Sequence, residues 1–99
     1  MKKDSLFYMA NLYPEIRRMF SFLDSGKIEA AQNAQIRSLD IVNKILNFRD
    51  IIPAGREEWN VVKNFILGFD KLDKYERIVL EKYAEPFSYK FMNNYSNIL

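Results

Sequence analysis

Carboxylates are the side chains in this sequence whose spacing most suggests chemistry. Asp70, Asp73 and Glu76 recur three residues apart, and Glu57 is followed directly by Glu58. Three carboxylates could hold a cation, but calcium loops use a longer ligand series with a central glycine, and di-iron bundles need Glu-x-x-His pairs. Asp73 followed by Glu76 also matches a helix capping box, and acidic residues suit the first turn of a helix. We therefore predict that these carboxylates cap helices and that the chain has no metal site.

Catalytic nucleophiles and bases are scarce in the 99-residue chain. It contains no histidine and no cysteine, which excludes thiolate nucleophiles, the usual zinc sites and imidazole acid–base catalysis. None of its serines lies in a Gly-x-Ser-x-Gly turn, and its three glycines are too far apart for a phosphate-binding loop. We predict a protein that is not an enzyme and binds no cofactor. An enzyme with a lysine, tyrosine or carboxylate site is the least favoured of three interpretations.

Basic residues support a second interpretation, a small nucleic-acid-binding helical domain. Such a domain would hold phosphates with basic side chains while Tyr75 or Tyr89 stacks on a base. The chain has fifteen basic and thirteen acidic residues, a net charge of +2, without the clustered basic excess typical of phosphate binding. This alternative requires that five residues converge on one face: Arg17, Arg18, Lys71, Lys74 and Arg77.

Apolar and aromatic residues near the two ends of the chain support the leading hypothesis. Hydrophobic residues make up 48% of the chain and aromatic residues 15%, and aromatic and methionine side chains are enriched at contact surfaces. We therefore predict a non-catalytic protein-interaction or assembly protein, either a homodimer or a small subunit of a larger complex. The expected interface residues are Phe7, Tyr8, Met9, Leu12, Phe87, Tyr89, Phe91 and Tyr95. The alternative is that the two ends pack on each other and complete the core.

Helical periodicity indicates which elements position these residues. The stretch Lys27–Phe48 is the longest without glycine or proline, and its apolar residues recur at helical spacing. No strand alternation or hairpin turn competes with helix anywhere in the sequence. The prediction is one all-α domain over residues 1–99, a small compact bundle of four to six helices around a central helix at Lys27–Phe48. The small side chains of Ala31 and Ala34 predict the closest helix packing there.

Prolines and glycines suggest where the other helices begin and end. The first helix is expected to open at Ser5, a good N-cap residue. Pro14 and Pro86 either begin new helices or kink existing ones, because proline suits a first turn and damages a helix interior. Gly26 predicts a left-handed turn before the central helix, and Arg49–Gly55 is predicted to be a loop.

Two further helices are expected after that loop. The first runs over Arg56–Phe69, with a buried face of Trp59, Val62, Ile66 and Phe69. The second runs from Lys74 to about Ala84, with a face of Leu72, Tyr75, Val79 and Tyr83. No secretory signal and no uninterrupted apolar run long enough to span a membrane is visible, so a cytoplasmic protein without a membrane partner is expected.

Overall fold

The computed structural model describes the backbone of residues 3–96 and the side chains of residues 3–90. Within that part of the chain it contains four α-helices, one short 3₁₀ turn and no strand, which confirms the predicted all-α fold. The elements are α1 (Ser5–Asp24), α2 (Ile28–Leu46), α3 (Pro53–Leu67), η1 (Phe69–Lys71) and α4 (Lys74–Ser96).

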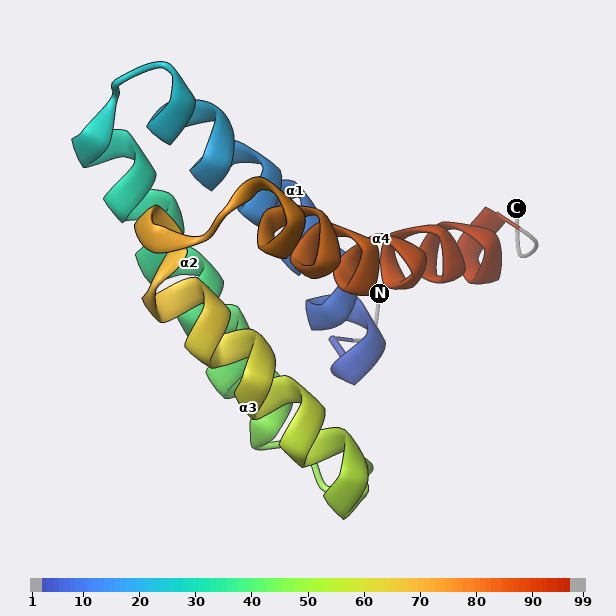
Figure 1. Cartoon of the computed structure of the whole chain (residues 1–99). Helices are drawn as coiled ribbons and strands as arrows, with labels where there is room; N and C mark the ends of the chain where they lie inside the picture. Colours follow the sequence, from blue (N-terminus) through green and yellow to red (C-terminus); the bar gives the residue numbers. More distant parts are fainter. Residues whose placement is uncertain (1–2, 97–99) are drawn as a thin grey trace.

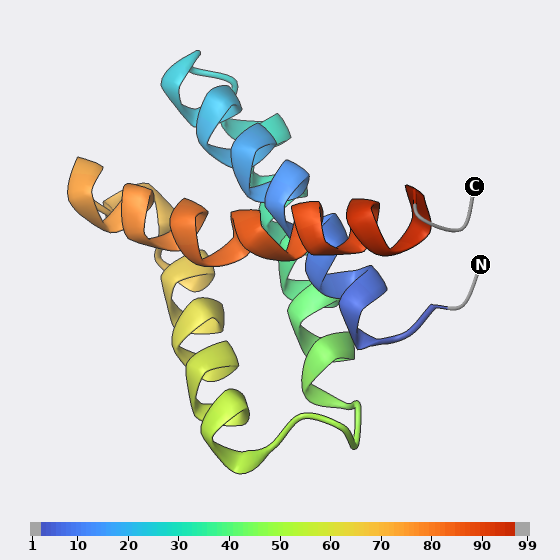
Figure 2. The ribbon, with the colours of Figure 1, turned by 90° about the vertical axis from the view of Figure 1, so that its right-hand side faces the viewer.

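The first three helices pack beside one another in chain order. α1 and α2 lie side by side and make the most extensive contact, and α3 runs back along α2 (Figure 1). α4 crosses over α1 at a steep angle (Figure 2). α3 and α4 therefore diverge from η1 like the two arms of an angle, with little direct contact between their backbones.

The predicted central helix is present but is not the longest. α2 has 19 residues, against 20 in α1 and 23 in α4. Its small residues Ala31, Ala34 and Ser38 are fully buried, which fits the close packing predicted at the two alanines. The buried hydroxyl of Ser38 donates a hydrogen bond to the carbonyl of Ala34 at 2.8 Å, so the small-residue face buries no unpaired polar group.

Both interior prolines lie within continuous helices. Pro14 is inside α1 and Pro86 is inside α4. The alternative that each proline begins a new helix is therefore wrong. Each proline removes one helical hydrogen bond. In α1, burial of neighbouring residues offsets that cost, because Leu12 and Ile16 on either side of Pro14 are fully buried. α1 is capped one residue earlier than expected, by Asp4, whose carboxylate accepts the backbone N–H of Phe7 at 2.9 Å.

The two turns that flank α2 and α3 match the predictions only in part. Gly26 has a φ of 74°, the left-handed conformation expected of it. The loop after α2 is shorter than predicted, because Pro53 occupies the first turn of α3 and Gly55 lies inside that helix. Of its two isoleucines, Ile51 packs against the core whereas Ile52 is 68% exposed.

Side-chain caps join α2 and α3 at both ends of their contact. The Arg56 guanidinium donates to the carbonyls of Leu46 and Phe48 at the end of α2. The Gln35 amide of α2 donates to the carbonyls of Ile66 and Leu67 at the end of α3, at 3.0 and 3.2 Å. Carbonyls in the last turn of a helix have no partner within the helix, so each helix satisfies part of the other's C-terminus.

The predicted capping box at the start of α4 is confirmed. The backbone N–H of Glu76 donates to the Asp73 carboxylate at 2.8 Å, and the backbone N–H of Asp73 donates to the Glu76 carboxylate at 3.0 Å. Two N–H groups that lack partners within the helix are satisfied in this way. The carboxylates of Asp73 and Glu76 therefore have a structural role.

Replacing Asp73 by alanine is expected to lower the free energy of unfolding by about 1 kcal/mol, because the first turn of α4 loses its cap. Urea denaturation followed by circular dichroism measures the change. The control is Asp70→Ala, since Asp70 is exposed and outside the capping box. Equal losses for the two variants would argue against a specific capping role.

Candidate protein-contact surface on α3 and α4

The interface residues predicted in the N-terminal segment are mostly covered by the fold. Met9 is 9% exposed and Leu12 is fully buried, and both belong to the core, so their assignment to a contact surface is corrected. Phe7 and Tyr8 are half-buried, and the Tyr8 ring lies 5.8 Å from that of Phe48. The reason is that α1 contacts both α2 and α4, so more than one of its apolar faces is covered.

The predicted C-terminal interface residues divide into three cases. Phe87 is half-buried, with its ring 5.5 Å from that of the buried Trp59. Tyr89 is 60% exposed. The side chains of Phe91 and Tyr95 lie outside the described residues.

α4 buries a different face from the one that its sequence predicts. Leu80 and Ala84 are buried, whereas Tyr75 is 74% exposed and Val79 is 40% exposed. Tyr83 is half-buried, with its ring 5.2 Å from that of Trp59 in an edge-to-face arrangement. Part of the apolar face predicted to enter the core is therefore turned to solvent.

Polar contacts with α1 accompany this orientation of α4. Arg77 pairs with Asp24 at 2.7 Å, and Glu81 lies 3.9 Å from Arg17. A third contact, from the Tyr13 hydroxyl to Glu85 at 2.9 Å, follows one turn later. Because Arg77, Glu81 and Glu85 are four residues apart, they share one side of α4, and directing that side toward α1 turns Tyr75 outward.

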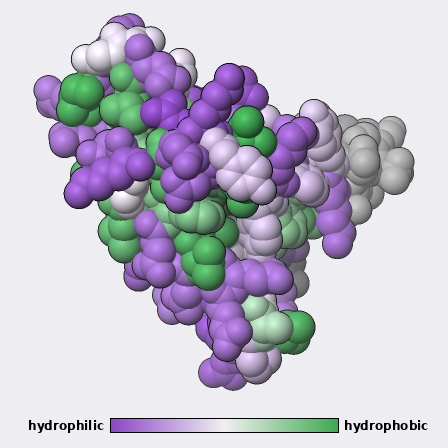
Figure 3. Space-filling model, in the orientation of Figure 1, coloured by the Kyte–Doolittle hydropathy of each residue, from purple (hydrophilic) through white to green (hydrophobic). Residues whose placement is uncertain are grey.

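A hollow of about 220 Å³ lies between the diverging helices, and we call it the α3–α4 groove. Figure 3 shows hydrophobic side chains in the angle between α3 and α4, surrounded by hydrophilic ones. Six of its seven lining residues are aliphatic or aromatic; the full set is Glu58, Val61, Val62, Phe65, Val79, Leu80 and Tyr83. The hollow is smaller than the roughly 300–1,000 Å³ of typical small-molecule sites, and suits a single large apolar side chain.

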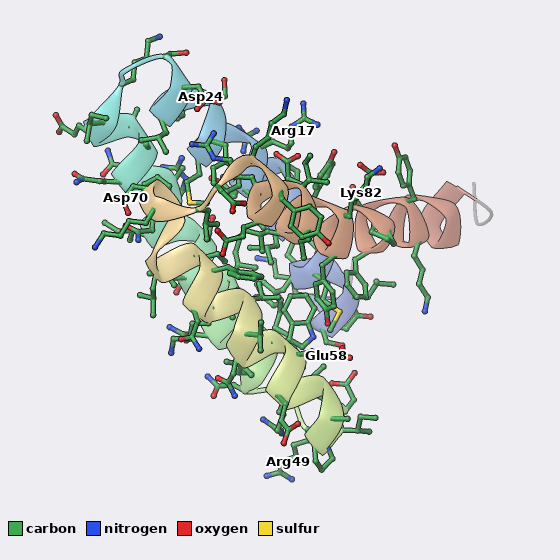
Figure 4. The ribbon with its side chains drawn as sticks, in the orientation of Figure 1. Arg17, Asp24, Arg49, Glu58, Asp70 and Lys82 are labelled. Carbon is green, nitrogen blue, oxygen red and sulfur yellow. The ribbon has the colours of Figure 1, made fainter. Side chains whose placement is uncertain are left out.

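The two polar side chains of the α3–α4 groove bind each other. The Tyr83 hydroxyl donates to the Glu58 carboxylate at 2.9 Å, and Glu58 is labelled beside the groove in Figure 4. Burial, together with the Glu58 carboxylate, raises the pKa of Tyr83 above its ordinary value. The groove therefore offers no unpaired polar group to orient a polar substrate. Among the described residues, no three carboxylates are placed to hold a metal ion.

A row of exposed apolar residues continues from the groove along α4. Tyr75, Ile78, Val79 and Tyr89 are 74%, 44%, 40% and 60% exposed, and we call them the α4 stripe. The spacing of three, four and fourteen residues from Tyr75 places them on one side of the helix. The sequence predicted the helix but placed Tyr75 and Val79 on the face expected to pack in the core.

The arginines proposed for nucleic-acid binding are engaged with carboxylates. Arg17 approaches Glu81, and Arg18 pairs with Glu15 at 2.9 Å. The hydrogen bond with Tyr13, with further contributions from Glu81 and Glu85, raises the pKa of Arg17. These pairs cancel much of the positive field that would attract phosphates.

The other three residues of that set lie around the start of α4. Arg77 pairs with Asp24 and lies over the Phe20 ring at 4.9 Å. Lys71 and Lys74 are exposed and adjacent in sequence to Asp70 and Asp73. Each of the three arginines thus lies close to a carboxylate, and each of the two lysines is next to an aspartate in the sequence. The five residues do not form an uninterrupted basic patch.

Comparisons with known proteins return no relative: no family model, curated protein or solved structure matches the chain. No helix in the described part of the chain combines the length and apolar character needed to cross a membrane.

Proposed function

We propose that this chain is a non-catalytic protein-interaction or assembly protein whose contact surface consists of the α3–α4 groove and the α4 stripe. The observation that supports the proposal is the adjacency of the two, because Val79 belongs to both. An apolar hollow next to exposed aromatic residues has the composition of an interface centre. Exposed apolar surface that runs across two elements is a recognised mark of contact sites.

The shape of the groove supports an anchoring role in this interaction. Binding energy at protein interfaces is concentrated where a large side chain enters a well-packed apolar pocket. Val61 and Phe65 on one side and Val79 on the other provide such a pocket. The two polar side chains of the groove, Glu58 and Tyr83, are hydrogen-bonded to each other. An apolar side chain that enters the groove therefore leaves neither of them buried without a hydrogen-bond partner.

Val79→Glu is expected to abolish the interaction while changing the free energy of unfolding by no more than about 0.5 kcal/mol, as for other exposed positions. The carboxylate would face the apolar groove and oppose entry of an apolar side chain. Affinity purification from the native source identifies proteins that accompany the wild type, and size-exclusion chromatography with light scattering measures self-association. Both are repeated with the variant.

Ile36→Glu is the matched control, because Ile36 is 63% exposed on α2 and lies outside the groove. The same aliphatic-to-acidic change there is expected to leave binding intact. A strictly monomeric wild type that retains no protein, or a partner lost equally from both variants, would contradict the proposal.

A further inference from the structure

The exposed charges on the α4 stripe are of one sign. Lys82 and Lys90 are exposed, and no ion pair among the described residues involves either of them. Lys82 is seven residues after Tyr75 and Lys90 is eleven residues after Val79, so both lysines lie along the stripe. Figure 4 shows Lys82 projecting from α4 on the side away from α3.

The carboxylates of α4 are engaged elsewhere. Glu76 belongs to the capping box with Asp73. Glu81 and Glu85 lie on the side of α4 that contacts α1, where they meet Arg17 and Tyr13. The stripe therefore combines an apolar and aromatic surface with positive charge that no carboxylate of α4 neutralises. The one carboxylate that lines the groove, Glu58, is on α3 and accepts the hydrogen bond of the Tyr83 hydroxyl.

From this charge pattern, and resting on the proposed function, we infer that the occupant of the surface is an acidic amphipathic helix of a different protein. One of its apolar residues fills the α3–α4 groove, and its carboxylates face Lys82 and Lys90. The two lysines are eight residues apart, or roughly 12 Å along the helix at 1.5 Å per residue. Carboxylates about two turns apart on the partner match that distance. This is the helix-in-groove mode of recognition.

A second copy of this chain fits the same surface less well. A two-fold dimer places the same patch of both subunits face to face. A dimer centred on the stripe would bring Lys82 toward its own equivalent, and like charges across an interface oppose association. Tyr75 and Tyr89 offer a stacking surface to a nucleic-acid base, but the aliphatic groove beside them offers no group that would bind a base or a phosphate, and its one charged lining residue is the carboxylate Glu58.

A pair of synthetic helical peptides tests the charge preference with the full chain. One peptide carries leucines at helical spacing with glutamates between them, and the other has lysine in place of each glutamate. Neither contains tryptophan, so the fluorescence of Trp59, whose ring lies edge-to-face with that of the groove residue Tyr83, reports binding. The glutamate peptide is expected to bind at least about tenfold more tightly, with an advantage that shrinks as salt is added.

Lys82→Glu is expected to weaken binding of the glutamate peptide about tenfold and to strengthen binding of the lysine peptide, since the rim charge is reversed. Lys27→Glu is the control, because Lys27 is exposed at the start of α2 and the net charge changes equally. Equal affinity for both peptides, or equal effects of both substitutions, overturns the inference.

Two further measurements separate the other occupants from the proposed one. Self-association of the wild type that Val79→Glu removes would identify a second copy as the occupant and overturn the inference. Binding to phosphatidylserine vesicles without binding to either peptide would overturn it in favour of an anionic membrane surface. If Val79→Glu loses a cellular partner while the peptides bind equally, the proposed contact surface stands and only the acidic partner is rejected.

Discussion

Replacing Trp59 by alanine is expected to lower the free energy of unfolding by about 3–5 kcal/mol, the range typical of large aromatic residues in cores. Trp59 is 2% exposed, and its ring lies 5.2 Å from that of Tyr83 and 5.5 Å from that of Phe87. This aromatic cluster links α3 to α4, whose backbones make little direct contact. Its loss therefore removes core packing and also one of the attachments that position α4.

The change is measured by urea denaturation followed by circular dichroism. Tryptophan fluorescence cannot be used, because the substitution removes the only tryptophan of the chain. Trp59→Phe is expected to lose less, since a ring remains between Tyr83 and Phe87. Val61→Ala, at a position 53% exposed on the same helix, is expected to change the free energy by about 0.5 kcal/mol or less. A loss for Trp59→Ala no larger than that of Val61→Ala would contradict the described packing.

Ala34→Leu is expected to destabilise the fold by about 1–3 kcal/mol, because inserting carbon atoms into a well-packed core forces side chains and backbone to shift. Ala34 is fully buried on α2, and its carbonyl also accepts the hydrogen bond from the Ser38 hydroxyl. Because Ala34 has no exposed surface, the added carbon atoms of leucine would have to displace packed neighbours. Thermal and urea unfolding both report the loss.

Gln32→Leu provides a control within the same helix, because it introduces the same side chain two residues earlier. Gln32 is exposed, and glutamine and leucine have similar helix propensities, so little change in the free energy of unfolding is expected. If Gln32→Leu and Ala34→Leu have the same effect, close packing at the small-residue face of α2 is not what limits the size of residue 34.

The parts of the fold that follow from local chemistry could be predicted from the sequence. The capping box at Asp73 and the left-handed turn at Gly26 each depend on a few neighbouring residues, and both are confirmed. The buried face of α3 is also confirmed, because Trp59, Val62 and Ile66 form a single apolar row opposite polar residues. Where one face is clearly apolar, helical periodicity is sufficient.

The prolines show where local rules fail. Proline disfavours a helix interior, yet Pro14 lies within α1 because the core needs the residues on both sides of it in one helix. Contacts between distant residues outweighed local propensity here. No pattern around Pro14 or Pro86 reveals that balance, since it depends on the helices packed against them.

The candidate contact surface was hidden from the sequence for a related reason. α4 carries apolar residues on several sides, so periodicity alone could not choose between Leu80 with Ala84 and Tyr75 with Val79. In the fold Leu80 and Ala84 enter the core, and Arg77 on the neighbouring side of α4 meets Asp24, 53 residues away in the sequence. Partners that far apart have no signature in a single sequence. This orientation leaves the predicted core residues Tyr75 and Val79 as candidate contact residues.

The caps between α2 and α3 have a mechanical consequence for the groove. Four hydrogen bonds, two from Arg56 and two from Gln35, join opposite ends of this helix pair, so α3 cannot slide along α2 without breaking them. α4 is held to the core by its buried residues Leu80 and Ala84 as well as by surface ion pairs with α1. Both walls of the groove are therefore anchored. A partner's side chain is expected to enter a preformed hollow, so that the partner and not the groove supplies most of the conformational adjustment.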